Sequence, residues 1–207
     1  MSEQSVTNRP DRLVLATHNP HKIEEFQSIV RATRPDVEVI GYDGPEPVED
    51  GVTFAQNALI KARAAAAHTG LPALADDSGI CVDVLGGSPG VFSAYWAGHA
   101  KDATANLELL LDQLSDVADP HRTARFVSTI ALVIPGGAEH VVEGSWPGRL
   151  ATAPRGEGGF GYDPIFIPDG QPEGAERTVG EWPAGEKNAA SHRARAFAAL
   201  TPLLADL

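Results

Sequence analysis

Cysteine is almost absent from this sequence: Cys81 is the single one among 207 residues. An internal disulfide needs two cysteines, so a disulfide framework within the chain is excluded. Cys81 stands in the apolar run Ile80-Cys81-Val82, where we expect a small core residue rather than a reactive thiol. Long hydrophobic runs are also missing. None approaches the roughly 18 residues of a membrane-spanning helix, so we expect no membrane partner. Because the N-terminal stretch MSEQSVTNRPDR is polar as well, we expect a cytoplasmic location.

Basic residues are also few: 16 Lys and Arg stand against 28 Asp and Glu, for a net charge of −12. A general nucleic-acid or membrane-surface binder needs a basic face, so we expect no nucleic-acid partner. A small anion held in a local basic pocket is still compatible with this charge. The length and the absence of repeats or linkers suit one domain, which we expect over residues 12–207, after a flexible tail over residues 1–11.

Hydrophobic spacing and capping residues divide the chain into alternating strands and helices. Asn19 followed by Pro20 predicts a helix start, because asparagine is a good N-cap and proline suits the first helical position. The elements expected, in chain order, are a strand over 12–17, a helix from 19, a helix between Thr53 and Gly70, a helix over about 102–115, an antiparallel pair of strands over 125–134 and 138–146, and a helix from about Ser191 that Pro202 kinks or restarts. This alternation predicts an α/β fold with a mixed β-sheet.

The junction between the first strand and the first helix, Thr17 to Lys22, is the first candidate site. A helix N-terminus offers free backbone N–H groups and the positive end of the helix dipole, which suit a phosphate. Lys22 falls in the first turn, where a cation is unfavourable unless an anion lies nearby; a side chain that points to water is the alternative. The glycines of a Walker A loop are absent. His18, His21 and Glu24 hint at a metal site, but this junction is poor geometry for one.

The adjacent acids Asp76 and Asp77 form the second candidate, inside the apolar stretch ALADDSGICV. No lysine or arginine stands within ten positions on either side. In an extended segment neighbouring side chains point to opposite faces, so we expect one carboxylate in a cleft and the other packed or bonded behind it. A cleft-facing carboxylate can hold a divalent cation or orient a water molecule. A solvated acidic turn is the alternative.

The segment RGEGGFGYDPIF, residues 155–166, contains a formal GxGxxG pattern. We reject a dinucleotide-binding fingerprint, because no helix follows and residues 162–166 indicate a strand. Phe160, flanked by glycines, suggests instead a flexible loop that presents a flat aromatic ring. A glycine loop around a buried Phe160 is the alternative.

Polar and basic residues gather in two further places. Asn57 and Lys61 lie four residues apart on the second helix, so both project from one face. Lys187, His192 and Arg193 cluster where the last helix begins, again at an end rich in N–H donors. Taken alone, this second cluster is equally compatible with a solvated basic patch.

The order and combination of these motifs resemble the inosine triphosphate pyrophosphatase family. The resemblance runs from residue 13 to about residue 200. The matching segments are THNPHK at 17–22, EDGVTFAQNALIKA from Glu49, LPALADDSGICVDVLGGSPGVFSA from Leu71, GSWPGRL at 144–150, GGFGYDPIF at 158–166 and EKNAASHR at 186–193. The resemblance implies hydrolysis of ITP, dITP and XTP to the nucleoside monophosphate and pyrophosphate. It also implies a homodimer, with an elongated sheet and two lobes around an active-site cleft in each chain.

The same resemblance implies roles for individual residues. Asp77 would be the catalytic base, supported by Asp76, and would share a magnesium ion, Mg²⁺, with Glu49. This ion, brought with the nucleotide, would neutralise the acids, and the lysines would offset the triphosphate. The substrate-binding residues would be Thr17, His18, Asn19, Lys22, Lys61 and Ser78, then Phe160, Gly161, Tyr162 and Asp163 in the wall of the base pocket, and Lys187, His192 and Arg193 at the oxo groups of the base.

Two positions depart from the family pattern. Tyr95 follows Ser93-Ala94 where relatives commonly carry arginine, and Gly185 stands where an acid is usual. Two other functions stay open: a Maf-type pyrophosphatase acting on pyrimidine or modified nucleotides, and a nucleotide sensor without turnover. The SHR segment and the GGFGYD loop disfavour the first. The intact set of acids and lysines disfavours the second, because a sensor has no need of a water-activating carboxylate.

Overall fold

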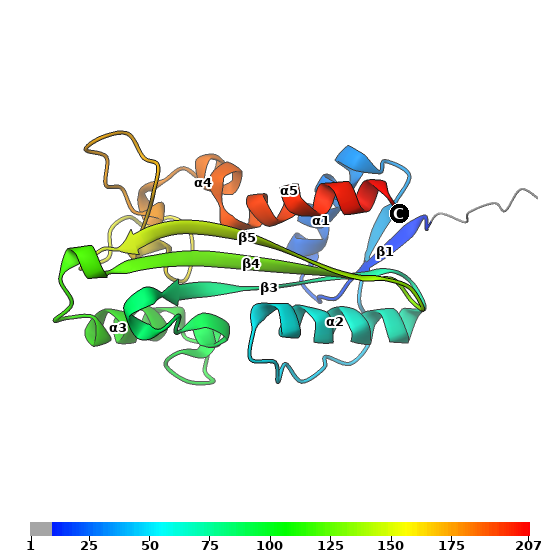
Figure 1. The fold of residues 1–207 in the computed structure, drawn as a ribbon, viewed down its shortest axis with the longest axis horizontal. Coiled ribbons are helices and arrows are strands. Elements are labelled where there is room, and N and C mark those ends of the chain that lie inside the picture. Colours follow the sequence, from blue (N-terminus) through cyan, green and yellow to red (C-terminus); the bar gives the residue numbers. More distant parts are fainter. Residues whose placement is uncertain (1–9) are drawn as a thin grey trace, which may run out of the picture.

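The computed structural model describes residues 10–207, which fold around a six-stranded mixed β-sheet (Figure 1). The strands are β1 Arg12–Leu15, β2 Glu38–Gly41, β3 Ala73–Val82, β4 Thr123–Val133, β5 Glu139–Leu150 and β6 Phe166–Pro168. Their order in the sheet is β2-β1-β3-β4-β5-β6. β1 runs parallel to β2 and β3, while the other neighbouring strands are antiparallel. The expected α/β fold with a mixed sheet is confirmed.

The three long strands β3, β4 and β5 extend from one end of the molecule to the other and give it an elongated shape (Figure 1). β1 pairs with β3 only as far as Leu74. Further along the same strand, an isolated bridge joins Cys81 to Pro89. Within the described residues no strand pairs with this edge of β3 between those two points. The acidic pair lies on this open stretch, just beyond the carboxyl end of β1.

The α-helices are α1 Pro20–Thr33, α2 Phe54–Thr69, α3 Ala103–Gln113, α4 Ala184–Ala190 and α5 His192–Ala205. Capping residues set their starts: the Asn19 side chain accepts the His21 N–H at 3.0 Å before α1. Gly70 ends α2 with φ at 69°, a left-handed conformation that glycine adopts without strain. Within residues 10–207, no helix combines the length and the apolar composition needed to span a membrane.

Different helices cover the two faces of the sheet at its parallel end (Figure 1). α1 and α5 pack on one face against residues such as Leu74, and the rings of Phe26 and Phe197 meet edge to face 4.7 Å apart in this core. α2 packs its alanines, such as Ala62, on the opposite face against Ala75. Side chains along β3 thus alternate between these two faces. The same alternation places Asp76 on the face of Leu74 and Asp77 on the face of Ala75.

The lobe at the other end of the long strands has its own core around Trp146 and Phe166. Arg122, almost completely buried, donates from its guanidinium group to the carbonyl oxygens of Leu114 at 2.6 Å and Leu150 at 3.0 Å. These bonds satisfy backbone acceptors at the end of α3 and tie this helix to β5. This core and the core between α1, α5 and the sheet lie on either side of the cleft described below.

The strand expected over residues 162–166 is wrong in its first part. Asp163–Ile165 form a 3₁₀ turn, and β6 begins only at Phe166. The physical reason is Pro164, which has no N–H to give to a sheet and a fixed φ that suits a helical turn. The turn is closed by the Ile165 N–H, which donates to the Tyr162 carbonyl at 3.1 Å.

Other boundaries differ less. β2 and α4 are elements that the sequence pattern did not predict, and Lys187 lies on α4 rather than at the start of the last helix. α5 continues through Pro202 as one helix. Of the tail expected over residues 1–11, Pro10 and Asp11 accept hydrogen bonds from the folded part, and residues 1–9 lie outside the described residues.

Candidate active site

Asp76 and Asp77 lie on β3 with their side chains on opposite faces of the sheet, as the alternation predicts. The Asp76 carboxylate is 8% exposed, and the Lys22 ammonium donates to its two oxygens at 2.9 and 2.8 Å. Burial alone would raise the pKa of Asp76, but Lys22, followed by Arg193 and Lys61, outweighs burial and lowers it. Asp76 is therefore an ionised anchor for Lys22.

Asp77 faces α2 and has a weaker partner. Lys61 Nζ lies 3.5 Å from Asp77 Oδ1 and 2.9 Å from Glu49 Oε2. The pKa of Asp77 is raised, mainly by burial and further by the negative charge of Glu49, against the opposing effects of Lys61 and Asn57. A carboxylate with a raised pKa accepts a proton more readily. Of the two adjacent acids, Asp77 therefore accepts a proton more readily.

Both contacts give the acids partners that the sequence pattern did not predict. The roles implied by the resemblance, in which the lysines offset the triphosphate and a cation brought with the nucleotide neutralises the acids, stay predictions. In the structure, Lys22 and Lys61 already contact Asp76 and Asp77, from positions 54 and 16 residues away in the sequence. The alternatives in which Lys22 points to water and the acids form a solvated turn are wrong.

Asn57 positions the α2 side of the site, although it was not among the expected site residues. Its Oδ1 accepts the Gly51 N–H at 2.9 Å, and a Cβ on Gly51 would lie 2.6 Å from the same oxygen. The loop that carries Glu49 is therefore held tightly against the first turn of α2. The four-residue spacing between Asn57 and Lys61 was the signal in the sequence that could have identified it.

Glu49 and Asp77 are the carboxylates for which Mg²⁺ is expected. Both contact Lys61, and Asp77 Oδ2 is buried with no hydrogen-bond partner among the described residues. Magnesium prefers oxygen ligands and usually keeps several waters, so one or two carboxylates suffice. The donors present therefore fit this ion. In residues 10–207 no group of three or more His, Cys, Asp or Glu side chains is arranged to hold a metal, so further ligands must come from water or substrate.

The junction before α1 ends beside Asp76. Thr17 Oγ1 accepts the Asn19 N–H at 3.2 Å, which shapes the turn that leads into the helix. Lys22 then projects from the first turn of α1 to the acid on β3. The expected phosphate-binding turn and the acidic pair are thus neighbours in space.

Three residues discussed above lie in settings that the structure defines. His18, expected at the substrate, lies with Nδ1 3.1 Å from Glu46 Oε1. The ring of Tyr95 stacks on His99 with centroids 5.3 Å apart. Gly185 lies within α4, so this departure falls in a helix.

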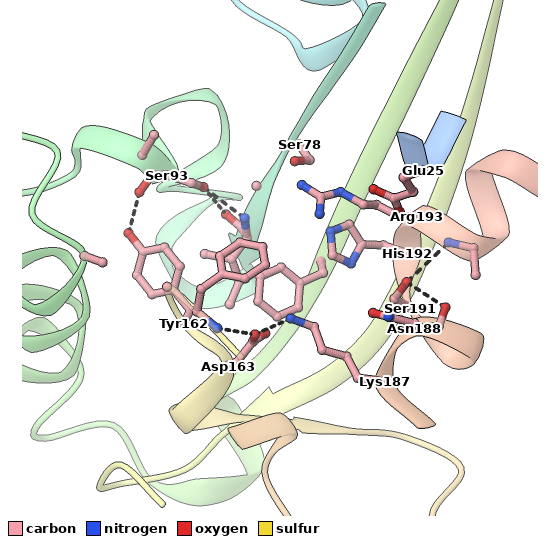
Figure 2. Close-up of a pocket in the computed structure, with 18 of the residues that line it drawn as sticks. Glu25, Ser78, Ser93, Tyr162, Asp163, Lys187, Asn188, Ser191, His192 and Arg193 are labelled. Atoms are coloured by element: carbon pink, nitrogen blue, oxygen red, sulfur yellow. Dashed lines mark hydrogen bonds and ion pairs between the residues drawn. The ribbon is translucent and has the colours of Figure 1, made fainter. Parts of the chain in front are cut away.

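A cleft of about 980 Å³ opens between the two lobes (Figure 2). Ser78, Ile80 and Phe126 line it from the same face of the sheet as Asp76. The expected substrate-binding residues that line the cleft are Ser78, Phe160, Gly161, Tyr162, Asp163, Lys187, His192 and Arg193. The remaining expected residues do not line it. Arg193 connects the two groups, because it lines the cleft and also lowers the pKa of Asp76.

Phe160 stands on the cleft wall with 65% of its surface exposed, so the alternative of a buried ring is wrong. Lys187 Nζ lies 4.3 Å from the ring centroid, and the central guanidinium carbon of Arg193 lies 5.7 Å from it. The Phe160 N–H donates to Asp163 Oδ2 at 2.8 Å, and this oxygen also pairs with Lys187. An exposed flat ring beside fixed cations suits a planar ligand that carries hydrogen-bond acceptors.

Tyr162 fixes the same wall to the long strands. Its hydroxyl donates to the Ser93 carbonyl at 2.8 Å, and Ser93 Oγ accepts the Ile80 N–H of β3 at 2.9 Å. Burial raises the pKa of Tyr162, so the phenol stays protonated and remains a donor. The Phe160 loop is thereby held at a set distance from the strand that carries the acids.

His192 begins α5 and lines the cleft (Figure 2). Its ring stacks on Phe126 with centroids 5.0 Å apart. Burial, and then the charges of Arg193 and Lys187, lowers the pKa of His192 to about 3, so the imidazole is neutral near pH 7. A neutral imidazole has one donor nitrogen and one acceptor nitrogen. It can therefore recognise a hydrogen-bonding pattern without adding charge.

Comparisons with known proteins agree with this arrangement. A model of the Ham1 family matches residues 13–203. A protein of Leifsonia xyli named dITP/XTP pyrophosphatase is 61% identical, over 95% of this chain and 96% of its own length. The solved structure of a HAM1 protein from Coxiella burnetii superposes with a TM-score of 0.85 at 39% identity, covering 95% of this chain and 99% of that one.

A solved structure from Mycobacterium abscessus, titled a nucleoside-triphosphatase and dITP/XTP pyrophosphatase, is similar at 48% identity. It gives a TM-score of 0.79 and covers 92% of this chain and 99% of its own. Both structural matches extend over nearly the whole chain, so the elongated sheet and the two lobes are common to them and this protein.

Proposed function

This chain belongs to the Ham1 family, and on that premise we propose that it hydrolyses the non-standard purine nucleoside triphosphates ITP, dITP and XTP. The products are the nucleoside monophosphate and pyrophosphate. One observation carries the proposal. The cluster of acids and lysines at β3 adjoins a cleft that contains an exposed aromatic ring and several hydrogen-bond donors. A triphosphate and a purine base fit these two regions, respectively.

The lysines are arranged to hold the triphosphate. An ammonium group has three N–H donors, and Lys22 directs two of them at the Asp76 oxygens. One donor remains for a phosphate oxygen, and the carboxylate keeps the ammonium in place before substrate arrives. Thr17 and Asn19 offer the start of α1 to the same anion. Such preorganised charges stabilise the departing pyrophosphate without reorganisation during the reaction.

Asp77 takes the proton from the attacking water. Its Oδ2 atom has no partner among the described residues, and its pKa is raised by burial, so it is free and basic enough to accept this proton. Water then attacks the α-phosphorus in line with the leaving pyrophosphate. Asp76 does not compete for the proton, because Lys22 holds it ionised.

Glu49 and Asp77 would hold Mg²⁺. When bound, this ion supplies positive charge that offsets the phosphate oxygens beside the two carboxylates. Support comes from the convergence of both carboxylates on Lys61.

The cleft recognises the base. Phe160 stacks on the purine, and Lys187, His192 and Arg193 offer donors to its oxo groups. Hypoxanthine and xanthine carry a 6-oxo acceptor where adenine carries an amino donor. Adenine would leave each such protein donor unpaired, at a cost of about 1–3 kcal/mol, which is roughly tenfold to hundredfold in rate.

The proposal extends to the setting of the enzyme. It acts in the cytoplasm on the free nucleotide pool, as a homodimer that needs no nucleic-acid or membrane partner. The net charge of −12 supports the absence of a nucleic-acid partner. Light scattering coupled to size exclusion measures the dimer directly, and a monomer at working concentration would contradict this part.

Pyrophosphate release from a panel of nucleoside triphosphates tests the function. We expect Mg²⁺-dependent release from ITP, dITP and XTP and little from ATP, CTP or UTP. A preference for pyrimidine or modified nucleotides would indicate the Maf-type alternative. Tight binding without release would indicate a sensor. Orthophosphate in place of pyrophosphate would contradict cleavage at the α-phosphorus.

A further inference from the structure

Two buried polar atoms near the base cleft have no hydrogen-bond partner among the described residues: Ser128 Oγ and His192 Nδ1. Both residues are more than nine-tenths buried, at 1% and 8% exposure. A buried polar atom without a partner is costly, so each one requires a physical explanation. Neither atom is accounted for by the proposed chemistry at the acidic pair.

The sheet register brings the two residues together. Ser128 on β4 lies directly opposite Gly144 on β5, so their side-chain positions share one face. A Cβ on Gly144 would lie 2.2 Å from the His192 carbonyl oxygen, so the His192 backbone fills this position. Phe126, two residues before Ser128 on the same face, supports the His192 ring at 5.0 Å. Ser128 is therefore a neighbour on the same face of both residues that His192 contacts, Gly144 through its backbone and Phe126 through its ring.

The protonation state of His192 makes the partner of Nδ1 decisive for which ring nitrogen carries the proton. The ring is neutral near pH 7, because burial and the charges of Arg193 and Lys187 oppose its protonation. One ring nitrogen then carries the proton, and the partner of the other nitrogen decides which one. Within residues 10–207, Nε2 has no hydrogen-bond partner and is not among the fully buried atoms. Since His192 lines the cleft, Nε2 is the nitrogen available to a ligand.

We propose that Ser128 is a specificity-determining positioning residue, whose hydroxyl donates to His192 Nδ1 through one buried water molecule and so keeps the ring proton on Nε2. This inference rests on the proposed function, because it assigns Nε2–H as a donor to the 6-oxo group of the purine. The opposite tautomer would present an acceptor, which suits the 6-amino group of adenine. Ser128 thus favours oxo-purines over adenine without touching the substrate. It does not discriminate against guanine, which also has a 6-oxo group.

Kinetics of Ser128→Ala tests the specificity. We expect the ratio of kcat/KM for ITP to kcat/KM for ATP to fall about tenfold, the effect of losing one hydrogen-bond preference. Ser128→Thr keeps a hydroxyl and should restore most of the ratio. Ser145→Ala is the matched control: it removes a serine hydroxyl from the neighbouring strand on the opposite face, and the ratio should not change. An unchanged ratio in Ser128→Ala would overturn the specificity role.

The ring ¹⁵N chemical shifts of His192 test the tautomer without any turnover, with the resonance assigned by its loss in His192→Gln. We expect a protonated Nε2 and an unprotonated Nδ1 in the wild type, and a shift toward the other tautomer in Ser128→Ala. A wild-type proton on Nδ1, or identical shifts in both proteins, would overturn the proposal. If the wild type releases no pyrophosphate from ITP, the proposed function fails, while the shifts still decide whether Ser128 controls the tautomer.

Discussion

The two faces of β3 differ sharply at consecutive residues. On one face, Asp76 is paired by Lys22 through two short contacts, and its pKa is lowered. On the other face, Asp77 shares Lys61 with Glu49 at a longer distance, and its pKa is raised. The residue type and the strand are the same for both acids. The main differences are the charges near each acid: Lys22 of α1 and Arg193 of α5 act on Asp76, whereas Lys61 of α2 and the negative charge of Glu49 act on Asp77.

This difference teaches that cation placement divides the roles of two identical side chains. A carboxylate that is paired closely with a cation is a poor base but a good electrostatic anchor. A buried carboxylate with only a distant cation accepts a proton more readily. The face of Asp76 continues into the base cleft, through Ser78 and Ile80. The face of Asp77 carries the residues that fit a metal ion.

Asp77→Asn should produce the largest effect, because the amide cannot accept the proton of the attacking water. We expect kcat for ITP to fall at least about 10³-fold, within the range for loss of a general base. Nucleotide binding, measured by calorimetry, should be largely retained, because Lys22 and the cleft are untouched. Near-wild-type turnover would remove Asp77 from the role of base.

Asp76→Asn should instead reduce stability. It leaves Lys22 beside a neutral group in a mostly buried setting, and breaking such a pair costs about 2–3 kcal/mol once the partial exposure of Lys22 is allowed for. Urea unfolding measures this loss, and Asp77→Asn is the matched control. Because burial penalises the charged form of Asp77, that variant should be as stable as the wild type or more stable. A reversed order of stability would contradict the assignment of the two faces.

The pH dependence of stability should have opposite signs for the two acids. The folded pKa of Asp76 lies below its ordinary value of 3.8, so its contribution is present above that pH and is lost as pH falls through the folded pKa. The folded pKa of Asp77 lies above 3.8, so its protonated form favours folding at low pH, and this benefit disappears as pH rises through the folded pKa.

Urea unfolding of the wild type and both Asn variants from about pH 3 to pH 7 measures this difference in sign. The destabilisation by Asp76→Asn should shrink toward acid pH. Any stabilisation by Asp77→Asn should grow toward neutral pH. Parallel curves for the three proteins would show that the acids titrate alike and would remove the contrast between the faces.

Local rules predicted the parts of the site that depend on near neighbours. Asn19 and Thr53 cap their helices because capping requires only residues two or three positions away. The opposite orientations of Asp76 and Asp77 follow from strand geometry alone. The role of Lys22 required more, since its partner lies 54 positions along the chain and only the packing of α1 on β3 brings them together.

The features that the sequence pattern missed have one local cause and two tertiary ones. Residues 162–166 have the composition of a strand, but Pro164 and the glycines before it favour a turn that positions Phe160. Asn57 has the right helical spacing, yet its partner Gly51 lies in a loop whose path cannot be read from periodicity. Ser128 gives no local signal at all, because its significance comes from the strand register and from a helix 64 residues later.

Phe160→Ala should give the smallest of these effects and should act only on the face of Asp76. The ring offers stacking surface to a purine, so its removal should raise KM for ITP about tenfold, the upper range for loss of one aromatic stacking contact. The inhibition constant of inorganic triphosphate, which has no base, should not change. Phe160 and Asp77 act on different steps. We therefore expect their free-energy changes in kcat/KM to add in the double variant Phe160→Ala, Asp77→Asn. The double variant can be measured if Asp77→Asn alone keeps detectable activity. Equal losses for ITP and triphosphate would argue against stacking and would mean that the cleft and the acidic pair do not divide recognition from chemistry.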